Sequence, residues 1–149
     1  MKLLPITTDN WRDAVFLTTD PERKFPIDEK WIASNAYSLL QCAYDTGWDS
    51  RLLVDGETPV GFVFYGYLEE DDRYLLCRYM IDEKYQGRGY GRAFLPLVLD
   101  QMRQQYRCRD IYTSVADDNP RAIHLYTSFG FTATEEMDAE ERVYILRGK

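Results

Sequence analysis

A glycine-rich turn joins an apolar strand pattern to the longest amphipathic helix pattern in the chain. Gly87, Gly89 and Gly91 alternate with Arg88, Tyr90 and Arg92 directly before that helix, and Lys84 stands just upstream. Glycine lets a backbone approach a ligand closely, and the N–H groups at a helix start attract anions. The pattern indicates either a phosphate-binding turn or a tight strand-to-helix turn without a ligand, and these residues alone favour neither.

The spacing excludes two common phosphate motifs. The turn is not G-x-x-x-x-G-K-[ST], so a nucleoside triphosphate loop is not expected, and alternating glycines are not the G-x-G-x-x-G of a dinucleotide fold. The basic residues of the turn stand out in a chain with 18 Lys and Arg, 25 Asp and Glu and a net charge of -7. An acidic chain is not expected to bind nucleic acid. A cationic partner suits it better, although solubility alone explains such a charge.

The rest of the chain alternates strand and helix patterns. Residues 51–54 and 60–67 are rich in branched and aromatic side chains and flank the turn 55–59, which predicts an antiparallel hairpin. Further strands are expected at 3–7, 74–81, 111–115 and 143–146. Helices are expected at 8–17, capped by Thr8, Asp9 or Asn10, at 28–44 with Leu39, Leu40 and Ala43 on its apolar face, after Gly89 as far as Tyr106, and at 120–129. The order predicts a mixed α/β fold.

Length and composition predict one domain over residues 1–149, because 45% of the chain is hydrophobic and no linker or repeat interrupts it. Cys42, Cys77 and Cys108 are widely spaced and the chain has one histidine, so neither a disulfide framework nor a metal site is expected. Reduced cysteines favour a cytoplasmic protein. No signal peptide or membrane-spanning pattern is present, so no membrane partner is expected.

Two motifs resemble the GNAT N-acetyltransferases. Gln86-x-x-Gly89-x-Gly91 after an apolar strand is similar to their acetyl-CoA signature, and residues 118–131 are similar to the block N-x-x-A-I-x-L-Y-x-x-x-G-F. Denser similarity between Asp55 and Tyr144 resembles the bacterial spermine/spermidine N-acetyltransferases. The resemblance implies a GNAT fold, with a mostly antiparallel twisted sheet flanked by about four helices, acetyl-CoA as cosubstrate, a polyamine acceptor and a homodimer.

The same resemblance implies roles for individual residues. Tyr126 is expected to act as the general acid that protonates the CoA thiolate, and Asn119 to hydrogen-bond the cofactor, to cap a helix, or both. The backbone of Tyr79, Met80 and Ile81 is expected to pair with the pantetheine arm. The cofactor-binding turn comprises Gln86, Gly87, Arg88, Gly89, Tyr90, Gly91 and Arg92.

Cys77 departs from the family pattern. Polyamine acetyltransferases of this type tend to carry a carboxylate at this strand position, so no general base is evident, and a cysteine without an adjacent histidine is expected to be buried and unreactive. Either a water chain that ends on another carboxylate deprotonates the amine, or the enzyme prefers mildly alkaline conditions. Other acceptors, such as a peptide amine, and a non-catalytic acyl-CoA sensor stay open. His124 is expected to be solvated, and the acidic turn 69–72 to be either solvated or a steering element for a polycation.

Overall fold

The computed structural model describes residues 1–19 and 35–148. Its strands are β1 (Lys2–Pro5), β2 (Trp48–Asp55), β3 (Thr58–Leu68), β4 (Arg73–Ile81), β5 (Ile111–Ala116), β6 (Thr132–Asp138) and β7 (Glu141–Leu146). Its α-helices are α1 (Trp11–Phe16), α2 (Asn35–Tyr44), α3 (Tyr90–Tyr106) and α4 (Pro120–Ser128). Two short 3-10 turns, η1 (Glu69–Asp71) and η2 (Glu83–Tyr85), flank β4.

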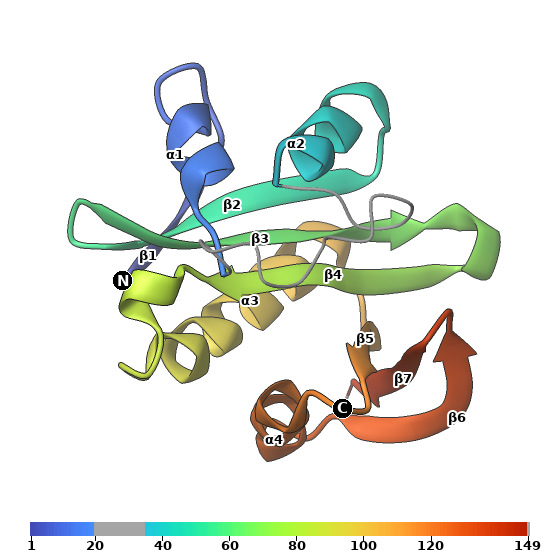
Figure 1. Ribbon diagram of the computed structural model, residues 1–149. Helices are drawn as coiled ribbons and strands as arrows, with labels where there is room; N and C mark the ends of the chain where they lie inside the picture. The colour runs from blue at the N-terminus through green and yellow to red at the C-terminus, as the bar shows by residue number, and fades with distance from the viewer. Residues whose placement is uncertain (20–34, 149) are drawn as a thin grey trace.

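The strands form one seven-stranded sheet in the order β1-β2-β3-β4-β5-β7-β6 (Figure 1). Neighbouring described strands run antiparallel except β4 and β5, which are parallel. Figure 1 shows α1 and α2 over one face of β2–β4 and α3 across the opposite face, with α4 beside β5–β7. This confirms the mixed, mostly antiparallel sheet with four helices.

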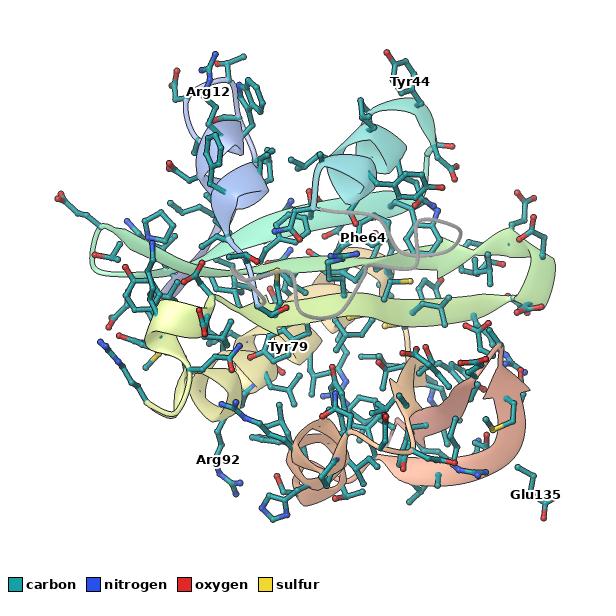
Figure 2. All side chains as sticks on the ribbon, viewed as in Figure 1. Arg12, Tyr44, Phe64, Tyr79, Arg92 and Glu135 are labelled. Carbon is teal, nitrogen blue, oxygen red and sulfur yellow. The ribbon has the colours of Figure 1, made fainter. Side chains whose placement is uncertain are left out.

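Each face of the sheet has its own hydrophobic core. On the face of α1 and α2, a small core gathers Ala14, Leu52 and Phe64, whereas the larger core on the α3 face includes Leu53 and partly buried Tyr79. Figure 2 shows Phe64 and Tyr79 on these opposite sides. Successive strand residues alternate between the two cores because side chains of a strand point to alternate faces.

The sheet divides between β4 and β5. They pair at Leu75 and Tyr112, and beyond this pair the two strands part. We call the opening between the separated parts of β4 and β5 the split. β4 also carries a bulge there: on β3, Tyr65 pairs with Leu76 and Phe64 pairs with Arg78, which leaves Cys77 without a partner. A bulge re-aims side chains and is common beside functional sites.

Most predicted elements are confirmed. The hairpin is β2–β3, the strand before the glycine turn is β4, and α4 begins at a proline and ends before Gly130, whose φ is +92°. In α3, Phe94, Leu95 and Val98 are buried as expected.

Three features at the edges of the fold differ from what the sequence predicts. β6 was not expected, because its residues show no apolar alternation and nearly all are exposed. In α2, Asn35 and Ser38 are buried while Leu40 is 58% exposed, so the buried face is shifted from the predicted one. Asn35 is tolerated there because its amide donates to the Ala14 carbonyl at 2.7 Å. Residues 28–34 of the predicted helix lie outside the described residues.

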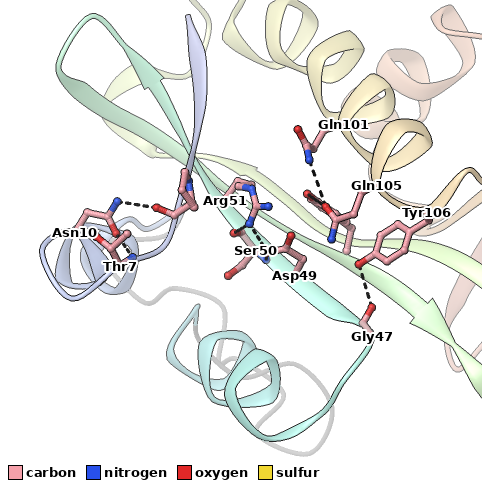
Figure 3. A network of polar contacts seen from close by, with 11 residues as sticks. Thr7, Asn10, Gly47, Asp49, Ser50, Arg51, Gln101, Gln105 and Tyr106 are labelled. Carbon is pink, nitrogen blue, oxygen red and sulfur yellow. Dashed lines mark hydrogen bonds and ion pairs between the residues drawn. The ribbon is translucent and has the colours of Figure 1, made fainter.

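The third difference concerns the start of α1. Asn10 occupies the N-cap position, but its side chain forms no cap hydrogen bond. Instead its Oδ1 accepts from the Thr7 N–H at 2.8 Å and its Nδ2 donates to the Pro5 carbonyl at 2.9 Å (Figure 3). The side chain therefore fixes the connection from β1 into α1. Among the helices of residues 1–19 and 35–148, none is long and apolar enough to cross a membrane.

Candidate active site

The glycine turn forms an open backbone cradle at the start of α3. Gly87 and Gly89 have φ values of +74° and +83°, and a Cβ built on either would meet no atom within 4 Å. Gly89 caps α3 without a side-chain cap bond. The first N–H groups of a helix have no acceptor within the helix, so those of α3 are available to an anion at this cradle.

Basic side chains border the cradle without closing it. The Arg88 guanidinium lies 5.6 Å from the Tyr85 ring centre, and that of Arg92 lies 5.4 Å from the Phe129 ring centre. Arg92 Nη1 also donates to Ser128 Oγ at 3.2 Å. Both arginines are exposed, as Figure 2 shows for Arg92, so their charge reinforces the anion-attracting end of α3.

Two predicted site residues tie the neighbouring elements together through their side chains. Gln86 Nε2 donates to the Ile81 carbonyl at 3.0 Å, and Gln86 Oε1 accepts from Arg121 Nη1 at 2.9 Å. The Tyr79 hydroxyl donates to the Gly91 carbonyl at 2.7 Å. These bonds join the end of β4 to α3 and α4, so both side chains hold in place the elements that carry the cradle.

The end of β4 exposes one backbone edge to the split. Tyr79, Met80 and Ile81 pair with β3 on one side, at Val63, Phe62 and Gly61. Among residues 1–19 and 35–148 their other edge has no strand partner, because β5 pairs with β4 only at Leu75. Unpaired backbone groups at a sheet edge bind extended ligands by hydrogen bonds.

Tyr126 lies on the other side of the split from this edge. It comes from α4, is 7% exposed, and packs against Phe131 with ring centres 5.3 Å apart. Burial raises the pKa of its hydroxyl to about 12, and a polar contact with the Thr113 hydroxyl only partly offsets this. Tyr126 therefore holds its proton at any ordinary pH. Burial raises the pKa of the Tyr79 hydroxyl, and nearby Tyr126 adds to that increase.

Asn119 lies at the start of α4 as a helix cap. Its Oδ1 accepts from the Ala122 N–H at 3.1 Å, which confirms the capping interpretation. His124 is exposed on α4, as predicted.

Cys77 contradicts the expectation of a buried side chain. Its thiol is exposed, because the bulge of β4 turns it out of the larger core. Surrounding protein nevertheless raises the thiol pKa to about 12, and the Asp138 and Glu141 carboxylates add to the increase. The thiol thus stays protonated and is a poor nucleophile, as predicted.

Three polar residues opposite Cys77 were not singled out as site residues from the sequence. Thr113 Oγ1 donates to the Leu76 carbonyl at 2.9 Å, and Ser114 Oγ donates to Glu141 Oε2 at 2.6 Å. The two hydroxyl residues of β5 are visible in the sequence. The contact of Ser114 with Glu141 depends on the β5–β7 register, which no local pattern encodes.

A second polar network lies away from the split, around β2 (Figure 3). Arg51 pairs with the Asp49 carboxylate and also donates to the Ser50 carbonyl at 2.9 Å. The Tyr106 hydroxyl donates to the Gly47 carbonyl at 3.0 Å, which fixes the end of α3 to the start of β2. This network braces the scaffold rather than the split.

The split can therefore bind an anion at the cradle and hold an extended chain on the β4 edge, with the protonated phenol of Tyr126 on its other side. No group of three or more metal-ligating side chains is found in residues 1–19 and 35–148.

The chain matches one family model, Acetyltransferase (GNAT) family, over residues 7–131. A spermine/spermidine N(1)-acetyltransferase of Bacillus subtilis (strain 168) is 40% identical over 85 residues, covering 53% of this chain and 56% of that protein. A spermidine N(1)-acetyltransferase of Vibrio cholerae is 31% identical over 80 residues, covering 47% and 46%. The matches span about half the length of these curated relatives.

Solved structures share the fold at low sequence identity. An acetyltransferase from Thermus thermophilus superposes with a TM-score of 0.75 at 21% identity, covering 98% of this chain and 96% of that one. The spermidine N-acetyltransferase from Vibrio cholerae in complex with CoA and spermine gives a TM-score of 0.73 at 20% identity, with coverage of 99% and 95%.

Proposed function

The chain belongs to the GNAT acetyltransferase family, and from this premise we propose that it transfers the acetyl group of acetyl-CoA to a primary amine of a small polyamine, spermine or spermidine. The observation that carries the proposal is the juxtaposition of the open glycine cradle, the unpaired edge of β4 and the buried Tyr126 hydroxyl. Each supplies one requirement of acyl transfer from a phosphate-bearing thioester.

The cradle fits the pyrophosphate of CoA. Positive φ at Gly87 and Gly89 turns successive N–H groups toward open space, and no Cβ obstructs an approaching phosphate. Arg88 and Arg92 supply positive charge nearby, while Gln86 supports the turn from behind. Tyr90, Gly91 and Asn119 stand at the helix starts that border this space.

The backbone edge of Tyr79, Met80 and Ile81 is placed to hydrogen-bond the pantetheine arm. An N–H of this edge that also reaches the thioester carbonyl would stabilise the oxyanion formed when the amine attacks. The amine nitrogen forms a bond to the carbonyl carbon, and the carbon–sulfur bond breaks. The departing thiolate then requires a proton.

Tyr126 supplies that proton. In water, a phenol with a pKa of about 12 would be a weak donor to a thiolate whose conjugate acid has a pKa of about 8.5. Burial disfavours a thiolate as it disfavours a phenolate, so a thiolate released beside the buried Tyr126 is more basic than in water and the transfer is less uphill.

The polyamine acceptor is supported by the identity to the Bacillus subtilis relative and by the net charge of -7, which suits a polycation. The second acceptor class is a peptide or other small amine. A panel of spermidine, spermine, diamines and lysyl peptides, assayed for CoA thiol release, distinguishes the classes. Tight binding of acetyl-CoA with no thiol release on any amine would instead indicate an acyl-CoA sensor.

Tyr126→Phe tests the assigned acid. Loss of a general acid lowers turnover by about 10²–10⁴-fold, so kcat should fall while the KM for acetyl-CoA stays nearly constant. Tyr65→Phe is the matched control, because it also removes a hydroxyl from a buried tyrosine, one bonded to Gln105 at 3.2 Å. Equal kcat values for the two variants would remove Tyr126 from the mechanism.

A further inference from the structure

Consecutive residues of β5 hold polar groups on opposite faces of the sheet beside the split. Thr113 bonds the Leu76 carbonyl of β4 at 2.9 Å and contacts the Tyr126 hydroxyl on the face of α3 and α4. Ser114 points to the other face, where its hydroxyl donates to the Glu141 carboxylate at 2.6 Å. The Tyr126 hydroxyl, which is the proposed proton donor, and the Glu141 carboxylate therefore lie beside neighbouring residues of β5, one on each face of the sheet.

Cys77 and Glu141 share that second face. Leu76 and Tyr79 both pack into the larger core, so the bulge leaves Cys77 facing away from α3. Ser114 lies two residues past the β4–β5 pair, as Cys77 does, and Glu141 begins β7 directly opposite Ala116. The Glu141 carboxylate thus stands across the mouth of the split from the position where a strand carboxylate was expected.

We propose, on the basis of the acetyl transfer proposed above, that Glu141 binds the ammonium group of the acceptor and takes up its proton. Glu141 is half-buried, and its Ser114 bond fixes one carboxylate oxygen. The second oxygen has no recorded bond to the described residues. Glu141 thus acts as the proton acceptor, a role that the protonated thiol of Cys77 cannot fill.

The charged groups around Glu141 leave it available to a cation. Arg142, the next residue, directs its guanidinium to Asp117, with two contacts of 3.1 Å. On β6, Asp138 pairs with Glu141 in the strand register and adds a second negative charge. Arg78 lies beside Cys77 on β4 and bonds Asn35 of α2 at 3.3 Å. Among the described residues, no ion pair includes Glu141.

The proton balance follows from this arrangement. The ammonium group gives one proton to the Glu141 carboxylate, directly or through one water, and the neutral amine attacks the thioester carbon. The amide nitrogen loses its second proton to solvent as the carbon–sulfur bond breaks, and Tyr126 protonates the thiolate. Burial is the main cause of the raised pKa of Tyr126, and the Glu141 charge adds to it, so neutralising Glu141 makes Tyr126 a better acid at the moment the thiolate leaves.

Glu141→Gln tests the proposal through the pH dependence of kcat/KM for spermidine, measured by thiol release. The wild-type enzyme accepts the ammonium form, so log kcat/KM should change little between about pH 7 and 9. The variant requires amine already neutral in solution, which is about a thousandth of the total near pH 7. Its kcat/KM should be about a thousandfold lower at about pH 7.5, and should rise about tenfold per pH unit toward the wild-type value.

Glu135→Gln is the matched control, because it removes a carboxylate of the same hairpin whose side chain points into solvent (Figure 2). It should retain the wild-type profile. The double variant Glu141→Gln with Cys77→Glu moves the carboxylate across the split to β4 and should recover most of the lost rate. Such a recovery also shows that Glu141→Gln does not unfold the protein.

Three outcomes overturn the inference. A Glu141→Gln profile that matches Glu135→Gln excludes Glu141 from proton uptake while leaving acetyl transfer intact. An equal loss at every pH, without a change of slope, indicates a structural role only. Absence of thiol release by the wild-type enzyme with every amine overturns the proposed function itself, and this inference with it.

Discussion

An alanine at Gly89 should damage both the fold and the cosubstrate site, for separable reasons. The φ of +83° lies in the left-handed region, where an added Cβ costs about 1–2 kcal/mol. For a chain of this size each kcal/mol lowers Tm by about 2–4 °C, so we expect a decrease of about 2–8 °C in a thermal melt. The Cβ itself meets no protein atom within 4 Å, so the space that it enters is the space proposed for phosphate.

The kinetic consequence is larger than the loss of stability. Displacing one charge-assisted hydrogen bond costs about 1.5–3 kcal/mol, so the KM for acetyl-CoA should rise at least about tenfold. Gly91→Ala is the control: its Cβ would lie 3.7 Å from Leu125 Cδ2, an ordinary contact, and its φ is not positive. Alanine within a helix is favoured over glycine by about 0.5–1 kcal/mol, so this variant should melt slightly higher, and its KM should rise less than that of Gly89→Ala. Equal Tm and KM for the two variants would refute the cradle geometry.

Other residues give independent checks of the fold and the site. Gly61→Ala should destabilise the protein by about 3 kcal/mol in urea denaturation, because its Cβ would lie 2.3 Å from the Met80 carbonyl oxygen; an unchanged midpoint would contradict the close β3–β4 contact. Asp82→Asn should cost about 1–3 kcal/mol by the same assay, since the buried carboxylate accepts from the N–H groups of Thr18 and Lys84, both at 3.0 Å. For Tyr126, a folded pKa of about 12 against about 10 in the unfolded chain means that its contribution is complete below about pH 10 and lost as pH rises through about 12, about 2–3 kcal/mol in all. Tyr126→Phe should flatten this alkaline loss by that amount, and an identical slope in the variant would show that Tyr126 is not buried as described.

The sequence was most informative where local chemistry and fold agree. Local residue types were sufficient to predict three parts of the fold. These are β2 and β3 with their branched and aromatic residues, α4 with its bounding proline and glycine, and α3 with the glycines before it. The acetyl-CoA motif also marked the cradle, because the positive φ values at Gly87 and Gly89 are a backbone requirement that few other residues meet.

The remainder depends on contacts between distant segments. β6 is an exposed edge strand, so burial imposed no alternation on its residues. The bulge that exposes Cys77 arises from the register between β3 and β4, and the approach of Glu141 to Ser114 arises from the register between β5 and β7. Neither register is written in a local pattern, so the sequence alone could not show that Glu141 of β7 lies across the split from Cys77.

The central claim is acetyl transfer to a polyamine within the split between β4 and β5. Its most direct test incubates the purified chain with acetyl-CoA and spermidine and measures free CoA thiol and acetylated amine together. We predict equimolar amounts of the two products, a much faster reaction with spermidine or spermine than with a lysyl peptide, and loss of both products in Tyr126→Phe. Thiol release that is independent of added amine, or none with any amine, would contradict the account.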